Sequence, residues 1–313
     1  MVEKELLDLI KEMSGSDTIY NESEGYYTSE GSPSWIAFRR AEQLTDVDNI
    51  SFLNNLLENS KDRKTRENVY FILGKIGTNT GDRRVADILL KRLEKETNKY
   101  SIEEILSRIA EQRNVKDCSP IIKFISDERS SVRHSAIEAL RGCKSSKAEE
   151  ALIEIISESI DEYDLNYANS VLSEIGTNKA IPHLINLLEH PKGSVKCSAL
   201  WALKELGSTS LLPIFLKALQ NRPFDVKGYA MLAINKHGNE SAINPVIERI
   251  KNMLKRKRTV ESDDLLVALE FLIRFKDDYK EISDLFDWIK SKKWVLLFGI
   301  EKNWLHTKFK SLN

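Results

Sequence analysis

The sequence predicts an all-α protein built as an α-solenoid, a stack of about seven helical hairpins. Residues 177–207 and 208–238 repeat one another at an offset of 31 residues, which aligns Gly207 with Gly238. Apolar residues in each copy follow the spacing of two amphipathic helices. Glycine and proline supply only 13 and 7 of the 313 residues, about half of their usual share, which argues against turn-rich β folds.

Each repeat unit carries two apolar stripes at helical spacing. In the unit that starts at residue 177 they comprise Ile181, Leu184, Ile185, Leu187 and Leu188, then Val195, Ala199, Ala202, Leu203 and Leu206. Unit ends fall near Gly77, Arg113, Lys144, Gly176, Gly207, Gly238 and Lys276. The glycines among them are expected to adopt the left-handed conformation of a helix C-cap. One hairpin cannot bury its apolar face alone, whereas stacked hairpins share a continuous core.

The two ends of the chain differ from the repeats. Residues 1–31 combine a short amphipathic helix with an acidic segment that has no helical period, and we expect this segment to be flexible. Ser32 and Pro33 then supply an N-cap and a first-turn proline, so the repeat region is predicted over residues 32–276. Residues 277–313 are expected to form capping helices, because their aromatic residues suit a lid over the last repeat.

Composition excludes several classes of protein. The 47 basic and 48 acidic residues nearly cancel, so no global field favours nucleic acid or an anionic membrane. Three cysteines without a CxxC motif, and histidines scattered over different repeats, predict neither a disulfide scaffold nor a metal site. No apolar run reaches the length of a membrane helix, and the N-terminus lacks the positive charge of a signal peptide. We therefore expect a cytoplasmic protein without a cofactor.

The second helix of the unit carries a family resemblance. The pattern is a short turn with Asp, Asn or His followed by (V)(R/K)xxAxxAL(x)xxG, as in SSVRHSAIEALRGCK (130–144) and GSVKCSALWALKELG (193–207). This unit resembles a HEAT repeat, and its short form is most similar to the bacterial HEAT-like repeats also seen in phycobilin lyase subunits. The resemblance covers residues 33–276. It implies a superhelix of hairpins that serves as an interaction scaffold, and it leaves the partner open.

Basic residues of the second helices align in one column: Arg66, Arg133, Lys196 and Lys227. Equivalent residues of a solenoid lie side by side, so we expect this column to form a ladder. One interpretation is a groove for phosphates or acidic side chains. The other is a structural ladder, because HEAT-like units pair such a residue with an Asp in the preceding turn, and Asp127 precedes Arg133 by six residues.

Aromatic residues occupy two further columns of the same helices: Tyr167, Trp201 and Tyr229. Both columns lie off the main apolar stripe, on the side that usually faces the concave surface of this architecture. We expect the three rings to lie close together there, where exposed aromatics anchor protein partners and can also stack bases. The alternative is that they fill the packing between repeats. Glutamates near these columns favour a protein ligand over phosphate.

A dense basic run also stands in the sequence: Lys251, Lys255, Arg256, Lys257 and Arg258. Such a run suits nucleic acid or an acidic partner. It also ends a predicted helix, where the dipole favours cations, and acidic residues follow at once. We interpret it as a solvated helix end.

Searches for catalytic signatures fail, because GxxxxGK[ST], GxGxxG, GxSxG and HExxH are all missing from the sequence. We therefore expect a non-enzymatic scaffold, adaptor or inhibitor that binds a protein partner through the concave second-helix face. The candidate contacts are Arg66, Arg133, Tyr167, Lys196, Trp201, Lys227 and Tyr229. One alternative is a nucleic-acid-binding HEAT-like protein, with or without the base excision of the HEAT-like DNA glycosylases that it would resemble. The other is a subunit similar to those of phycobilin lyases. The residue constellations of these two families do not match here residue by residue.

Overall fold

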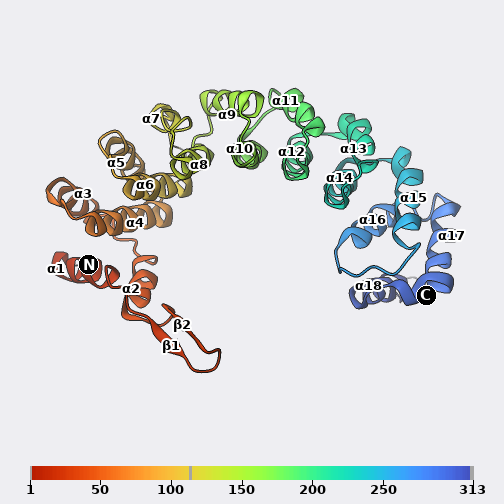
Figure 1. The fold of residues 1–313 in the computed structure, drawn as a ribbon, viewed down its shortest axis with the longest axis horizontal. Coiled ribbons are helices and arrows are strands. Elements are labelled where there is room, and N and C mark those ends of the chain that lie inside the picture. The colour runs from red at the N-terminus through yellow and green to blue at the C-terminus, as the bar shows by residue number, and fades with distance from the viewer. Residues whose placement is uncertain (1, 113–114, 311–313) are drawn as a thin grey trace. The chain divides into compact units, whose positions relative to one another are not determined.

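The computed structural model describes residues 2–112 and 115–310 (Figure 1). The predicted unit end near Arg113 lies outside the described residues. The chain divides into two compact units, unit 1 (Met1–Val171) and unit 2 (Leu172–Asn313), and each is described by itself. None of the described helices combines the length and the apolar character that crossing a membrane requires.

Unit 1 begins with α1 (Glu3–Met13), the antiparallel strands β1 (Ile19–Asn21) and β2 (Tyr26–Thr28), and α2 (Pro33–Ala41). Four helical hairpins follow: α3 (Asn49–Asn59) with α4 (Arg63–Thr80), α5 (Arg83–Leu93) with α6 (Lys99–Glu111), α7 (Ser119–Ile122) with α8 (Ser130–Ala139), and α9 (Ser146–Glu158) with α10 (Glu162–Ile175), which runs past the unit boundary. The second helices α4, α6 and α8 pack against one another in this order.

Unit 2 continues the pattern with three hairpins: α11 (Ile181–Asn186) with α12 (Gly193–Leu206), α13 (Leu212–Leu219) with α14 (Phe224–His237), and α15 (Ile243–Met253) with α16 (Asp264–Ile273). The helices α17 (Lys280–Trp288) and α18 (Gly299–Lys310) follow the last hairpin. Because α12, α14 and α16 also pack in series, the prediction of an α-solenoid of about seven hairpins is confirmed over the described residues.

Local signals in the sequence explain where the helices begin. Asp62 caps α4 by accepting a hydrogen bond from the backbone N–H of Thr65 at 2.7 Å, and Asn98 and Ser145 cap α6 and α9 in the same way. Prolines stand in the first turns of α11 and α13, where the missing N–H costs little.

The glycines that close the units do not adopt the expected left-handed conformation. Gly207 has φ −82° and Gly238 has φ −71°, and among these helix ends only Gly81, after α4, is left-handed. These glycines are needed because neighbouring groups approach their Cα atoms too closely to leave room for a Cβ. A Cβ on Gly207 would lie 2.5 Å from the carbonyl oxygen of Leu203, and one on Gly238 would lie 2.7 Å from the ring of Phe271.

The N-terminal segment is more ordered in conformation than the sequence predicted. As expected, α1 is amphipathic, and its apolar face is buried against α2 and α4. The sequence predicted no regular structure for the acidic segment after α1, yet residues 19–28 form a two-stranded hairpin. Gly25, with φ 74°, closes its turn, and the rings of Tyr20 and Tyr27 meet across the strands at 5.0 Å between centroids.

Candidate functional site

Two surfaces of each unit carry the candidate residues. In every hairpin a short turn joins the first helix to the second, and stacking in one orientation aligns these turns along one side, here called the turn edge. The exposed side of the second helices is called the second-helix face. Figure 1 shows, within each unit, the first helices forming one layer and the second helices the other.

The basic column lies on the turn edge. Its members are each the fourth residue of their helix, one turn after the loop: Arg66 in α4, Arg133 in α8, Lys196 in α12 and Lys227 in α14. The column therefore places positive charge at the N-terminal ends of helices, where the helix dipole disfavours it unless an acid compensates.

In unit 1, acids of the next hairpin compensate both arginines. The guanidinium of Arg66 donates to Glu96 at 3.2 Å, in the turn between α5 and α6. Arg133 donates from Nε to both carboxylate oxygens of Asp164, at 2.9 and 2.8 Å, and from Nη2 to Asp161 at 3.1 Å. These pairs tie each hairpin to the following one, so in unit 1 the column is a structural ladder.

The preceding turn does not supply the acid that the family resemblance led us to expect. The carboxylate of Asp127 accepts two hydrogen bonds from Arg129, both at 2.8 Å, which hold the pKa of Asp127 below its ordinary value. Arg133 reaches only the backbone carbonyl of Asp127, at 2.9 Å. The ladder therefore runs forward to the next hairpin.

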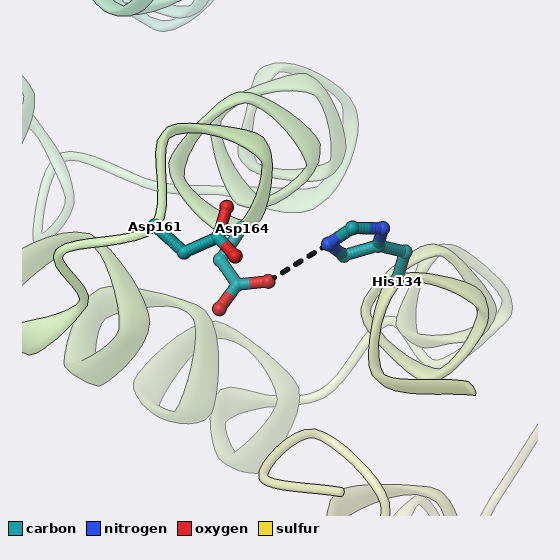
Figure 2. Close-up of side chains that lie close together, drawn as sticks. All are labelled: His134, Asp161 and Asp164. Carbon is teal, nitrogen blue, oxygen red and sulfur yellow. Dashed lines mark ion pairs between the residues drawn. The ribbon is translucent and has the colours of Figure 1, made fainter. Parts of the chain in front are cut away.

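Around Arg133 the structure gathers a His–Asp–Asp cluster, which Figure 2 shows. Nε2 of His134 lies 3.0 Å from Oδ1 of Asp164, and Asp161 lies beside them. Three such ligand atoms within 4.8 Å of one another can in principle hold a metal ion. Here the Arg133 guanidinium already hydrogen-bonds both carboxylates. A divalent cation would face this fixed positive charge, so the donor set fits an ion-pair network better than a metal site.

Opposing influences set the acidity of Asp161. Burial raises its pKa, whereas hydrogen bonds from the backbone N–H groups of Tyr163 and Asp164 and the charges of Arg133 and His134 lower it. The net pKa is below the ordinary value. This carboxylate is therefore ionised at neutral pH and is no general acid.

In unit 2 the column has a different environment. The side chains of Lys196 and Lys227 are half-buried, and neither makes an ion pair or side-chain hydrogen bond with any part of the chain that the structure describes. Glu189, an acid close enough to Lys196 to feel its charge, forms an ion pair with Lys217, whose ammonium lies 2.9 Å from it. Lys217 is the main cause of the lowered pKa of Glu189, and Lys196 adds a weaker contribution.

The missing ion pair of Lys196 follows from the sequence of the turns. At the repeat spacing of 31 residues, the position of Asp161 corresponds to Lys192 and then to Pro223. Neither residue offers a carboxylate. The turn edge of unit 2 thus keeps the basic column in α12 and α14, and the turns before these two helices have no carboxylate at the position of Asp161.

The aromatic candidates lie on other parts of the two units. Trp201 on α12 and Tyr229 on α14 are 40% and 36% exposed on the second-helix face of unit 2. No ring contact joins them among the described residues of this unit. Tyr167 belongs to unit 1, where its ring stacks on His134 at 4.8 Å between centroids and 26° between planes. Tyr167 therefore packs on the ladder, as the packing alternative proposed.

Helix geometry separates the basic column from the aromatic one. Lys196 and Trp201 are five residues apart, which is about 500° of helical rotation, so their side chains leave α12 about 140° apart. The structure accordingly assigns the seven predicted residues to two surfaces, the turn edge and the second-helix face, rather than to a single groove.

Trp201 is held in place by charged residues that the sequence analysis did not select. Nζ of Lys204 lies 3.7 Å from the centroid of the indole ring. Glu205 bridges Lys204 and Lys236, at 2.7 and 2.5 Å, and these hydrogen bonds, first from Lys204 and then from Lys236, lower the pKa of Glu205. Lys236 follows Glu205 by 31 residues, which is the repeat spacing. A search for opposite charges one repeat apart could therefore have found this ion pair in the sequence.

The basic run after α15 is solvated only in part. Lys255, Arg256 and Lys257 are exposed, as expected for a helix end. Arg258 is not: its guanidinium forms two 2.6 Å hydrogen bonds with Glu301 of α18, which is fully buried. The interpretation of the whole run as a solvated helix end is therefore wrong for Arg258, because the C-terminal helix covers it.

Comparisons with known proteins identify the repeat. Residues 181–258, from α11 to the loop after α15, match a family model described as HEAT repeats. No curated protein matches the sequence.

Three solved structures are similar to the chain. The complex of CpcE and CpcF of phycocyanin lyase from Nostoc sp. PCC7120 has 19% identity and a TM-score of 0.45, over 77% of this chain and 93% of that chain. An engineered protein has 18% identity and a TM-score of 0.49, over 91% and 84%. YibA from Escherichia coli has 18% identity and a TM-score of 0.49, over 85% and 100%. Residues 181–258 of this chain therefore match HEAT repeats, and the described hairpins on either side of them repeat the same pair of helices.

Proposed function

We propose that the chain is a non-enzymatic scaffold, adaptor or inhibitor that binds a protein partner on the second-helix face of unit 2. The observation that carries the proposal is the exposed indole of Trp201, fixed beneath the ammonium of Lys204. Tryptophan is among the residues that dominate binding energies at protein interfaces.

Fixation of the ring matters as much as its exposure. An exposed side chain normally loses rotamer freedom when a partner binds, and this loss reduces affinity. The cation–π contact at 3.7 Å and the bridge from Lys204 through Glu205 to Lys236 hold the indole in one orientation before binding. Trp201 is therefore a preorganised anchor.

The surroundings of the anchor indicate the chemistry of its partner. Tyr229 adds a second exposed aromatic ring on the neighbouring helix α14. Lys204, Glu205 and Lys236 place both signs of charge beside the indole. Such a face suits a protein segment with an apolar side chain for the centre and mixed charges for the rim.

Two further observations fit a scaffold that works inside the cell. In the cluster of His134, Asp161 and Asp164, Arg133 forms ion pairs with both carboxylates, which favours a structural role over catalysis. All three cysteines are buried free thiols, which suits the reducing cytoplasm.

The test is a capture experiment from a lysate of the source organism, with and without nuclease. Tagged protein is compared with a Trp201→Ala/Tyr229→Ala variant and with Tyr100→Ala, which removes an exposed ring of unit 1 that also lies beneath a cation. Loss of an anchor costs about 2 kcal/mol or more, which is roughly a thirtyfold loss of affinity. A protein retained by the unchanged chain and by Tyr100→Ala, but lost by the double variant, supports the proposal. Equal recovery by all three chains refutes it.

A further inference from the structure

The net charge of the chain is near zero because its two units carry opposite net charges. Unit 1 has 24 basic and 32 acidic residues, a net of −8, and unit 2 has 23 basic and 16 acidic residues, a net of +7. The balance that argued against a polyanionic partner therefore does not apply to unit 2 by itself.

Part of the excess positive charge lies on the turn edge of unit 2. Lys196 and Lys227 stand one turn into α12 and α14 and have no acidic partner among the described residues. Their counterparts in unit 1, Arg66 and Arg133, are both ion-paired. A cation at a helix N-terminus weakens the helix, and neither lysine has the ion pair that offsets this cost in unit 1.

The turns themselves add further cations to this edge. Arg222 is exposed in the turn before α14. Lys255, Arg256 and Lys257 are exposed in the turn between α15 and α16. The ion pair of the next residue, Arg258, with buried Glu301 fixes this last turn to α18. The turn inside the hairpin of α13 and α14 and the turn inside the hairpin of α15 and α16 thus both present positive charge.

An aromatic ring lies within the basic edge. Phe224, the first residue of α14, is 51% exposed between Arg222 and Lys227. The guanidinium of Arg249 lies 5.3 Å from the centroid of its ring. Exposed rings beside cations are the stacking platforms of single-strand-binding proteins. Four acids share the edge: Glu189, which Lys217 neutralises, and the exposed residues Asp225, Glu261 and Asp263.

We propose that the turn edge of unit 2 binds single-stranded nucleic acid, with its cations on successive phosphates and Phe224 against a base. Adjacent helices of a stack are about 8–10 Å apart, so one group of cations per hairpin forms a line along the unit. A line of charge matches an extended polyanion better than a compact acidic patch on a folded protein. This surface is separate from the second-helix face, so the proposal does not depend on the protein-binding function.

The test is fluorescence anisotropy with the full chain and labelled 20-nucleotide oligomers, poly(dT) and an unstructured RNA. If about four phosphates are contacted, log affinity should fall with log salt at a slope near −3. Affinity would then drop roughly fiftyfold between 50 and 200 mM salt. Lys196→Gln/Lys227→Gln should lower the affinity about tenfold at 100 mM salt and reduce the slope by about 1.4, since two phosphate contacts are lost.

A matched control removes the same charge from unit 1. Lys61→Gln/Lys95→Gln changes two exposed lysines in turns of that unit and should leave binding unchanged. Equal losses in the unit 1 and unit 2 variants would overturn the assignment to this edge. Absence of oligomer binding at 50 mM salt would overturn the proposal, and so would binding of a labelled poly-glutamate probe alone, in favour of an acidic protein.

Discussion

The buried pair of Arg258 and Glu301 offers a sharp test of how unit 2 is closed at its C-terminal end. The carboxylate of Glu301 accepts two hydrogen bonds at 2.6 Å from the guanidinium and one at 2.8 Å from the backbone N–H of Phe298. Nη2 of Arg258 also donates to the carbonyl of Leu296 at 3.2 Å. The perturbation is Glu301→Gln, which keeps the size of the side chain and removes its charge.

The expected magnitude follows from burial. Glu301 is 0% exposed, and the side chain of Arg258 is 12% exposed, so the variant leaves a guanidinium that neither water nor an acid compensates. Breaking such a pair typically lowers the free energy of unfolding by about 3–5 kcal/mol. At 2–4 °C per kcal/mol for a domain of this size, Tm should fall by roughly 10 °C. Replacing both partners by apolar residues, Arg258→Met/Glu301→Leu, should recover much of this loss.

The assay is urea unfolding of the full chain together with hydrogen exchange across α18 and the turn before α16. Glu189→Gln is the matched control, because it breaks an ion pair with Lys217 whose two side chains are largely exposed and should not change stability measurably. Faster exchange in α18 should accompany the loss in Glu301→Gln. Indistinguishable unfolding midpoints for Glu301→Gln and Glu189→Gln would refute the reasoning.

Three further predictions concern packing, reactivity and pH. Gly77→Ala should destabilise the chain, because its Cβ would lie 2.9 Å from both Cβ and Cγ1 of buried Val85, a stiff side chain. Gly193→Ala, whose Cβ would have no neighbour within 4 Å, should not, and thermal melts compare the two variants. Burial raises the pKa of the Cys143 thiol to about 12, so an aromatic disulfide reagent at pH 8 should label it only after unfolding. The pKa of Asp161 in the folded chain is below its ordinary value, so Asp161→Asn should lower the free energy of unfolding at pH 7. The difference in stability between the two chains should vanish as the pH falls through that folded pKa. Urea melts of both chains at pH 7 and pH 2 measure this difference.

Sequence reasoning predicted the fold well because a solenoid is built from local contacts. The unit ends predicted at Gly176, Gly207 and Gly238 directly follow the last residues of α10, α12 and α14. Each apolar stripe meets the equivalent stripe one repeat later, so the period alone specifies the packing. The hairpin of β1 and β2 escaped prediction because each strand is only three residues long, too short for an alternating pattern to be recognised.

The functional surfaces were less predictable, for a geometric reason. Aligning the repeats compares equivalent residues, such as Arg133 with Lys196, and so it identifies columns of similar side chains but not the residues that those side chains contact. The partner of a column residue lies elsewhere, in the turn of the next hairpin, as the spacing of 28 residues between Arg133 and Asp161 shows. The alignment also does not show the direction in which each side chain leaves its helix. Only the rotation of about 100° per residue along α12 reveals that Lys196 and Trp201 leave the helix on different sides.

The same helix position therefore has two physical roles in one chain. In unit 1 an arginine at the fourth residue of α8 is compensated by Asp164, and the cost of a cation at a helix N-terminus is offset by a bond between hairpins. In unit 2 the turn contains Pro223 where the repeat of unit 1 has Asp161, and Lys196 forms no ion pair with any residue that the structure describes. What distinguishes the two roles is the presence of an acid one repeat downstream, so repeat proteins of this kind are better analysed in pairs of adjacent units than in columns of equivalent residues.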